Sequence, residues 1–350
     1  MIIPDLTPPV GADFQKSPPS WQLALKAAIR DPVELCGLLQ LPADLVPAAK
    51  RAARGFPLFA PRGYVDRMRP GDPRDPLLLQ VLPLDEELSD TADFVPDPVG
   101  DGRAEVTPGL LHKYYGRVLL VTTGACAIHC RYCFRRHFPY GEMPHSLAAW
   151  QSALEQIAAD PTIEEIILSG GDPLTLVDSL LGRLVERLEA ISHVRRLRIH
   201  TRLPIVVPER VCQDLFDWLR GTRLTPIVVV HANHPAEISP SVANALARLI
   251  DARICVLNQS VLLKRINDNA DVLADLCRRL VELHVMPYYL HQLDRVQGAA
   301  HFEVAADVGM ALVTELRRRL PGYAVPRYVR EVAGAPFKEP VMPEWADWKT

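Results

Sequence analysis

The sequence lacks any long apolar run and any strong excess of charge of one sign. Its longest apolar stretches, such as 118–121 and 227–230, are far shorter than the roughly 20 residues that span a bilayer. Thirty-nine basic residues against 42 acidic ones leave a net charge of −3, which gives no general attraction to nucleic acid or anionic membranes. The first residues show neither a basic start nor a sustained apolar run, so we expect no secretory signal and a cytoplasmic location.

A disulfide framework is also missing. The chain has seven cysteines, an odd number, and at 350 residues its core needs no covalent staples. Four cysteines are scattered and are expected to be small buried hydrophobic residues: Cys36, Cys212, Cys255 and Cys277. The other three are crowded at Cys126, Cys130 and Cys133 and need a different explanation.

The first part of the chain is irregular. The segment 20–30 has helical spacing with Ser20 as a candidate cap, whereas 56–98 is dense in proline, glycine and aspartate. We therefore predict that residues 1–105 form an accessory region, helical and then proline-rich, that wraps a larger unit.

From residue 116 onward, apolar segments alternate regularly with amphipathic ones. The predicted strands are 117–123, 164–171, 195–201, 225–231, 253–260 and 285–291. The predicted helices are 146–159, 177–191, 208–221, 240–252, 270–283 and 303–320. Six such units indicate an α/β fold with parallel strands and right-handed crossovers, as in a barrel or a wound sheet. We expect the core at 106–322 and a C-terminal extension at 323–350.

Polar residues follow the predicted strands, on the face where α/β folds build their sites. After the first strand, Cys126, Cys130 and Cys133 have C-x3-C-x2-C spacing, which suits three irons of a [4Fe–4S] cluster and leaves the fourth iron open. A tetrahedral zinc ion would need a fourth ligand, for which His129 or His137 is a candidate. The position of the loop after the first strand favours the cluster.

This loop resembles the signature of the radical S-adenosylmethionine (SAM) superfamily. The resemblance implies a partial (β/α)6 barrel of the TIM type, with SAM bound at the open iron and cleaved to a 5′-deoxyadenosyl radical. It also implies that Tyr132 lies beside the adenine. The glycine motif after the second strand is expected at the SAM amino group: Ser169, Gly170, Gly171 and Asp172.

Further motifs narrow the likeness. CRYCFRRHF, LSGGDPL, HANHPAEIS, LNQSVLLKRIND and PYYLHQLDRVQGAAHF together resemble the lysine 2,3-aminomutases, from about residue 108 to 340. That family binds pyridoxal phosphate (PLP) through an imine on a lysine near the C-terminus. The resemblance implies that Lys338, in VAGAPFKEPV, has this role, although the loop has fewer glycines than is usual. Tyr114 and Arg117 match PLP-contacting residues, with Arg117 at the phosphate.

The same resemblance implies a substrate site. Arg135 matches the arginine that binds the amino-acid carboxylate, and Asp294 matches an aspartate at the distal ammonium. Glu331 stands where the family has a second aspartate, so it keeps the charge and adds a methylene. That exchange leaves open another basic substrate, such as arginine.

Other polar residues at the strand ends have weaker assignments. His231 and His234 match positions near the cofactors, and Asn258 and Gln259 are within the segment expected to reach SAM or PLP. His200 and Arg202 share this rim without an assigned role. His231 and His234 are equally well explained as core or rim histidines with satisfied hydrogen bonds.

The short tail, Glu331 and the N-terminal segment resemble one branch, the aminomutases of the elongation factor P β-lysylation pathway. This implies conversion of (S)-α-lysine to (R)-β-lysine, with partners that include L-lysine, an electron donor such as flavodoxin or ferredoxin, and elongation factor P or its ligase. No cysteine follows Cys277, and Asn269 stands where larger members have one, so no structural zinc is expected. A radical SAM enzyme without PLP and a non-enzymatic cluster-binding module are the alternatives.

Overall fold

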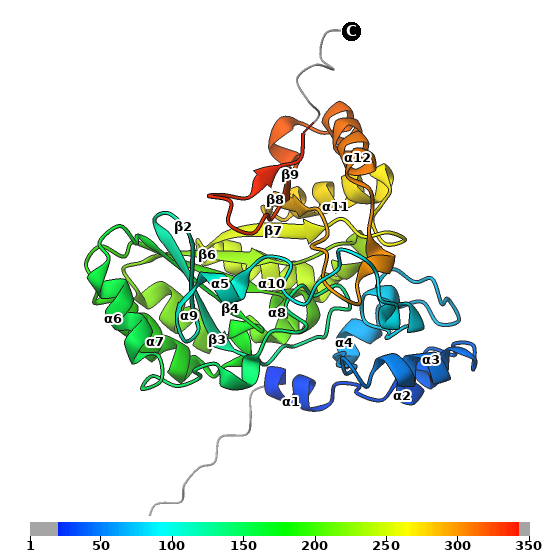
Figure 1. Cartoon of the computed structure of the whole chain (residues 1–350), viewed down its shortest axis with the longest axis horizontal. Helices are drawn as coiled ribbons and strands as arrows, with labels where there is room; N and C mark the ends of the chain where they lie inside the picture. Colours follow the sequence, from blue (N-terminus) through cyan, green and yellow to red (C-terminus); the bar gives the residue numbers. More distant parts are fainter. Residues whose placement is uncertain (1–19, 343–350) are drawn as a thin grey trace, which may run out of the picture.

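The computed structural model describes residues 20–342 and places ten strands in one sheet (Figure 1). The expectation of no secretory signal concerns residues 1–19 and lies outside the described residues, as does the tail after 342. The parallel strands are β3 (Arg117–Thr123), β4 (Glu165–Gly170), β5 (Arg196–Thr201), β6 (Thr225–Val230), β7 (Cys255–Val261), β8 (Met286–His291) and β9 (Arg327–Arg330). The antiparallel strands at the two ends are β1 (Glu105–Thr107), β2 (Leu110–Tyr114) and β10 (Glu339–Pro340).

The order of the strands distinguishes the two architectures that the sequence left open. Each strand pairs with the next one along the chain, from β1 to β10, and the order never reverses. In a doubly wound sheet the order does reverse, and helices then cover both faces. Unreversed order with right-handed crossovers puts the helices on one face, and the twisted sheet curls around the other. The prediction of a partial barrel in the α/β class is therefore confirmed.

The covering helices follow the prediction closely in number and order. They are α6 (Gln151–Ala159), α7 (Asp178–Glu189), α9 (Gln213–Gly221), α10 (Pro240–Asp251), α11 (Ala270–Glu282) and α12 (Ala306–Arg319). Capping fixes where two of them begin: the Ser239 hydroxyl accepts from the Val242 N–H, and the Asn269 amide oxygen accepts from the Asp271 N–H.

The third predicted helix is split in the structure. A 3-10 turn, η5 (Pro208–Arg210), precedes α9, and a short helix, α8 (Leu203–Val206), lies before it. At the interruption, the buried Arg210 guanidinium donates to the Leu174 carbonyl and to Asp178.

Alternate side chains of the strands have opposite environments. On β4, Ile166 and Leu168 belong to the core beneath the helices, whereas Ile167 and Ser169 line a cavity inside the curled sheet. On β5, Leu197 and Ile199 likewise face the core, while Arg198 and His200 line the cavity. The period of two in a strand therefore supplies one apolar face for folding and one polar face for a site.

The N-terminal region packs against the barrel. It contains α1 (Ser20–Lys26), α2 (Pro32–Leu38), α3 (Leu45–Ala52), α4 (Arg62–Val65) and α5 (Asp101–Ala104), with the 3-10 turns η1 (Leu78–Gln80) and η2 (Asp85–Leu88). The blue helices of this region lie along one edge of the molecule in Figure 1. Its buried residues, including Trp21, Tyr64 and Leu77, share one hydrophobic cluster with the barrel. The domain boundaries at 105 and 322 stay a prediction.

A buried ion pair fastens this region to the cysteine loop. Both guanidinium nitrogens Nε and Nη2 of Arg131 donate to Glu87, at 2.8 and 2.6 Å, and Arg136 donates to the same carboxylate at 2.7 Å. Phe56 lies under both guanidinium groups, 4.7 and 4.8 Å from its ring centre. One carboxylate therefore compensates two buried cations of the loop.

No helix among residues 20–342 is both long and apolar enough to cross a membrane.

Candidate functional site

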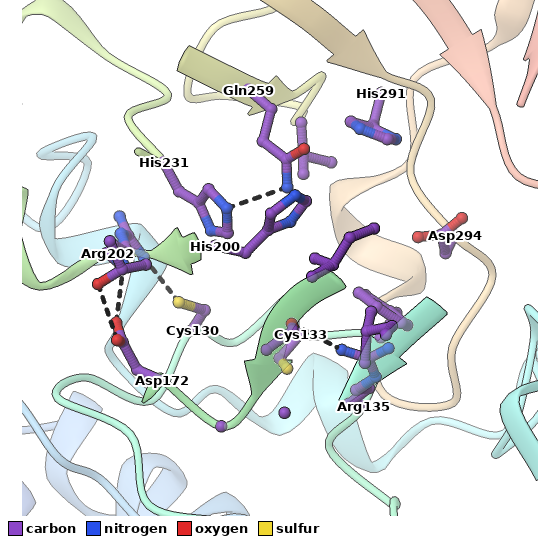
Figure 2. Close-up of a pocket in the computed structure, with 18 of the residues that line it drawn as sticks. Cys130, Cys133, Arg135, Asp172, His200, Arg202, His231, Gln259, His291 and Asp294 are labelled. Carbon is purple, nitrogen blue, oxygen red and sulfur yellow. Dashed lines mark hydrogen bonds between the residues drawn. The ribbon is translucent and has the colours of Figure 1, made fainter. Parts of the chain in front are cut away.

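A cavity of about 630 Å³ lies inside the curled sheet and extends from the cysteine loop to the β9–β10 hairpin. This volume is within the usual range for small-molecule sites. Figure 2 shows side chains from several strands pointing into it. Apart from His234 and Asn258, the residues that the sequence assigned to a cluster, cofactor or substrate line this one cavity: Tyr114, Arg117, Cys126, Cys130, Tyr132, Cys133, Arg135, Ser169, Gly170, Gly171, Asp172, His231, Gln259, Asp294, Glu331 and Lys338.

The three cysteines lie on the loop between β3 and α6. The Cys133 N–H donates to the Cys130 carbonyl at 3.0 Å, which closes a tight turn and brings the thiols to the same wall. Burial raises the pKa of the Cys126 thiol and raises that of Cys133 to about 11. Without a cation these two thiols therefore stay neutral, and bound iron is the kind of charge that would offset their burial.

Among residues 20–342 no three His, Cys, Asp or Glu side chains converge on a point that would hold one metal ion. A [4Fe–4S] cluster needs one thiolate at each of several corners rather than convergence. Of the two candidate zinc ligands, His129 Nδ1 lies 2.8 Å from the Pro57 carbonyl, and His137 Nε2 lies 3.1 Å from the Gln297 carbonyl. Each ring keeps its other nitrogen as a potential ligand, so the preference for a cluster rests on the cysteine spacing.

The glycines after β4 are required by close packing against the cysteine loop. Gly170 has φ +118°, and a Cβ there would lie 2.7 Å from the Thr123 carbonyl oxygen. A Cβ on Gly171 would lie 2.3 Å from the Ala125 carbonyl oxygen, well inside van der Waals contact. The motif therefore holds the end of β4 directly against the segment that leads into Cys126.

Asp172 completes this junction. Its carboxylate accepts from the Thr201 hydroxyl at 2.7 Å and from the backbone N–H groups of Leu174, Arg202 and Leu203 at 3.1, 2.7 and 3.2 Å. Burial raises its pKa even though these bonds favour the charged form. Asp172 therefore ties the β4 end to the β5 end, a structural role in addition to its position at the cavity wall.

A chain of alternating charges runs along one side of the cavity. Arg135 Nε donates to Asp101 at 2.6 Å, and Lys113 Nζ lies 2.6 Å from the other Asp101 oxygen. Lys113 also donates to Glu331 at 2.9 Å, and Glu331 pairs with Lys338. Burial alone would raise the pKa of Glu331, but Lys338 and Lys113 together lower it to about 2. The carboxylate is therefore ionised throughout the physiological range.

Asp294 differs from Glu331 although both line the same wall. Burial, reinforced by the Glu331 charge, raises the pKa of Asp294 to about 7. No cation of residues 20–342 forms an ion pair with Asp294, so this carboxylate is available to bind a positively charged ligand. Arg117 is its counterpart among the cations: it stacks on Tyr114, 4.7 Å from the ring centre, and pairs with no carboxylate of the described chain.

Three imidazoles also line the cavity. Burial lowers the pKa of His231 and of His291 to about 3, and it also lowers that of His200, so all three rings are neutral. His231 Nε2 lies 3.0 Å from Gln259 Nε2. The Nε2 atoms of His200 and His291 are buried without a hydrogen-bond partner in the described structure, which suits a cavity that contacts a polar ligand.

Two residues of the weaker assignments lie outside the cavity lining. His234 Nδ1 accepts from the Ala236 N–H at 3.1 Å and caps the 3-10 turn η6 (Pro235–Glu237). The Asn258 amide bonds to the Ala232 N–H and carbonyl, at 2.9 and 3.2 Å, and so joins β7 to the end of β6. Both are explained by these backbone contacts.

Sequence reasoning missed Lys113 and Asp101, which connect Arg135 to Glu331. Lys113 directly precedes Tyr114, and this position next to an assigned residue was the only local signal. Asp101 follows Gly100, whose φ of +68° turns the chain toward the cavity, and nothing in the sequence marks that contact. An ion pair between Arg198 and Glu165, at 3.2 Å on the cavity floor, was also unforeseen.

Comparison with known proteins shows what this chain is similar to. The model of the radical SAM superfamily matches residues 120–225. The chain is similar to the L-lysine 2,3-aminomutase of Escherichia coli K12, 46% identical over 322 residues that cover 92% of this chain and 94% of that protein. It is 45% identical to the enzyme of the same name from Haemophilus influenzae, over 91% and 94% of the two chains. A solved radical SAM methyltransferase from Sphaerobacter thermophilus has a TM-score of 0.43 and 19% identity, over 63% and 68%.

Proposed function

This chain belongs to the L-lysine 2,3-aminomutase family of radical SAM enzymes, and from that premise we propose that its cavity converts (S)-α-lysine to (R)-β-lysine with PLP. Membership makes it an isomerase and implies a [4Fe–4S] cluster and SAM. The observation that supports the proposal most is the gathering of the cysteine loop, Arg135, Asp294, Glu331 and Lys338 around one cavity. The proposed reaction type requires the cysteine loop and Lys338 at the same cavity, and the proposed charge of the substrate requires Arg135, Asp294 and Glu331 there as well.

When bound, the cluster and SAM supply a 5′-deoxyadenosyl radical, and PLP supplies the π-system through which an amino group can migrate. Cys126, Cys130 and Cys133 would hold three irons. Lys338 would bind the PLP aldehyde, and Arg117 would bind its phosphate, because it is the cavity cation without a carboxylate partner in the described chain. Barrel walls exclude water from the radical.

The substrate is held by charge at both ends. Arg135 would bind the carboxylate of lysine, since its guanidinium is fixed in place by Asp101 and by the Ser169 hydroxyl at 3.2 Å. Asp294 and Glu331 would bind the distal ammonium. Glu331 already pairs with Lys113 and Lys338, so Asp294, which has no cationic partner among residues 20–342, would supply the uncompensated negative charge for the ammonium. Glutamate or leucine would leave that negative charge uncompensated.

The proposed physiological role is β-lysylation of elongation factor P. The match over nearly the whole length of the E. coli enzyme supports a common reaction. The partners would be L-lysine, a flavodoxin- or ferredoxin-type electron donor, and elongation factor P or the ligase that attaches β-lysine to it.

An anaerobic assay tests the proposal. The reconstituted and reduced protein is given SAM, PLP and L-lysine, and β-lysine is followed by mass spectrometry with chiral separation. We expect (R)-β-lysine from the unmodified protein, and none from Cys130→Ala or Lys338→Ala. Lys264→Ala, which removes an exposed lysine that does not line the cavity, is the matched control and should turn over normally.

Other outcomes separate the alternatives. SAM cleavage without β-lysine would move the substrate to another amino acid, with arginine tested next because of Glu331. Full turnover by Lys338→Ala would refute the PLP assignment. Free lysine and lysine already attached to elongation factor P are compared in parallel. Conversion of only the attached form would show that lysine is attached before it is isomerised, and not afterwards as proposed.

A further inference from the structure

Arg202 makes an unusual contact for a buried arginine. It follows β5, its side chain is 5% exposed, and its Nη1 donates to the Cys130 Sγ at 2.7 Å. Figure 2 shows the guanidinium of Arg202 directed at the Cys130 sulfur from the strand-end side of the cavity. Cys130 is the middle residue of the C-x3-C-x2-C loop, so this cation lies beside a thiol assigned to iron.

The position of the guanidinium is fixed by groups from three parts of the chain. Its Nη2 donates to Gln80 at 2.6 Å, in the N-terminal region, and to Glu237 at 2.8 Å, in the turn after β6. The Arg202 N–H donates to Asp172 at 2.7 Å. Gln80 and Glu237 are fully buried, so the hydrogen-bonded groups around Arg202 form a frame that leaves the guanidinium little freedom to move away.

The frame also includes the aromatic residue of the cysteine loop. The Asn233 amide donates to the Tyr132 hydroxyl at 2.6 Å and to Gln80 at 3.0 Å. The Arg202 guanidinium lies 5.8 Å from the centre of the Tyr132 ring. One network therefore holds the arginine, the loop and the N-terminal region together.

We propose that Arg202 is a positioning residue that acts through Cys130 and raises the reduction potential of the cluster. The inference rests on the proposed ligation of the cluster by Cys130. Reduction adds one electron to the cluster, from a one-electron donor and without a proton. A fixed cation that donates a hydrogen bond to a ligating sulfur stabilises the more negative, reduced state more than the oxidised state.

The chain contains a matched arginine that should not have this effect. Arg210 is also fully buried and ion-paired, in its case to Asp178 at 2.7 Å. Its Nη1 lies 3.6 Å from the Sγ of Cys212, a cysteine outside the loop. Arg210 therefore has the burial, the ion pair and even the sulfur contact of Arg202, but not the neighbouring cluster.

The experiment is a redox titration of the reconstituted protein without PLP or lysine, followed by the electron paramagnetic resonance signal of the reduced cluster. Iron and sulfide content are measured for each variant, so that the potential is compared only between proteins with equal clusters. We expect Arg202→Gln to have an about tenfold lower ratio of reduced to oxidised cluster at a fixed ambient potential, equivalent to a midpoint about 59 mV more negative. Arg202→Lys keeps the charge and should fall between Arg202→Gln and the unmodified protein.

The outcomes are separable. Arg210→Gln should leave the potential unchanged, and an equal shift in that variant would show a general effect of buried arginines and overturn the proposal. An unchanged potential in Arg202→Gln, or a shift in Arg202→Lys as large as that in Arg202→Gln, would also overturn it. If Arg202→Gln fails to incorporate a cluster, the midpoint potential of Arg202→Lys decides. A midpoint more negative than that of the unmodified protein supports the proposal, and an unchanged or less negative midpoint overturns it.

Failure of the proposed function would look different. If Cys130→Ala kept a full cluster at an unchanged potential, the ligand assignment would be wrong, and the inference would fail with it. If the potential shifted as expected while no β-lysine formed in the activity assay, the inference would stand and only the proposed substrate would be wrong.

Discussion

The ammonium of Lys113 lies 2.9 Å from the carboxylate of Glu331, although 218 positions separate the two residues in the sequence. Lys113 is on β2, at one end of the sheet, and Glu331 follows β9, near the other. Their contact crosses the cavity mouth and connects Arg135, the proposed carboxylate-binding residue, with Lys338, the proposed PLP lysine.

Replacement of Lys113 tests this connection. In Lys113→Met, Glu331 keeps only Lys338 as a cationic partner, so bonding of Lys338 to PLP would leave the buried Glu331 carboxylate without a cation. We expect PLP to bind about threefold to tenfold more weakly, because leaving a buried charge unpaired costs free energy. A PLP titration followed by imine absorbance measures this. Lys113→Arg should bind PLP nearly as the unmodified protein does, and equal binding by Lys113→Met would contradict the role of the charge.

Asp294 predicts a pH dependence. Its folded-state pKa of about 7 is above the ordinary value of an unfolded aspartate, near 3.9, so the folded protein binds the extra proton between these pH values. The contribution of this group to stability is therefore present at low pH and is lost as the pH rises through about 7. We expect Asp294→Asn, which cannot ionise, to gain thermal stability relative to the unmodified protein as the pH increases from 5 to 8.

The affinity for lysine should change with pH in the direction opposite to the stability contribution of Asp294. The distal ammonium needs the ionised carboxylate, so lysine affinity should increase as the pH rises through about 7 and should lose this dependence in Asp294→Asn. Melting curves and equilibrium binding at four pH values are the measurements. Asp44→Asn, at an exposed aspartate without a capping bond, is the control. The same pH profile in Asp294→Asn and the unmodified protein would contradict the assignment.

The ion pair at Glu87 predicts a large loss of stability. Glu87→Gln leaves two buried guanidinium groups, Arg131 and Arg136, without their carboxylate, and breaking a buried pair in this way costs about 3–5 kcal/mol. Chemical denaturation measures the free energy of unfolding. Glu164→Gln breaks an exposed pair with Arg196 and should cause no measurable change. Equal effects of the two substitutions would show that burial of the pair is not what matters.

The glycine junction predicts loss of the cluster without loss of the fold. In Gly171→Ala the new methyl group would meet the Ala125 carbonyl, so the cysteine loop has to move away from β4. We expect iron content after reconstitution to fall severalfold while the circular dichroism spectrum stays unchanged. Gly37→Ala places a methyl group in open space within α2 and should keep full iron, with a small gain in helix stability. Normal iron content in Gly171→Ala would refute the steric argument.

Much of the barrel was predictable because its strands and helices carry strong local patterns. β3 was predicted with its observed bounds, Arg117–Thr123, since the apolar run 118–121 at its centre lies between a turn and the cysteine loop. β9 was missed because four residues, with charged arginines at both ends, have no pattern of their own. That strand exists only because β8 offers an open edge, and pairing with an edge is a tertiary effect.

The assigned site residues were predictable by motif, and the contacts that hold them were not. Cys130 stands in a recognisable spacing, but nothing near Gln80 indicates a contact with Arg202, 122 positions later. Such contacts depend on how the N-terminal region packs, and packing is specified by the whole core rather than by local sequence. For the same reason the ion pairs of Lys113 could not be foreseen from LHKYYGR.

The contact between Gln80 and Glu237 has a consequence for synthesis of the chain. The two residues are 157 positions apart, and a ribosome that adds about 5–20 residues per second needs on the order of ten seconds to make that span. Throughout that time Leu77, Leu78 and Leu82, all fully buried in the finished protein, have no barrel to cover them. The yield of correctly folded protein in a cell should therefore depend on how well chaperones protect the nascent N-terminal region until β6 and the turn after it have been translated.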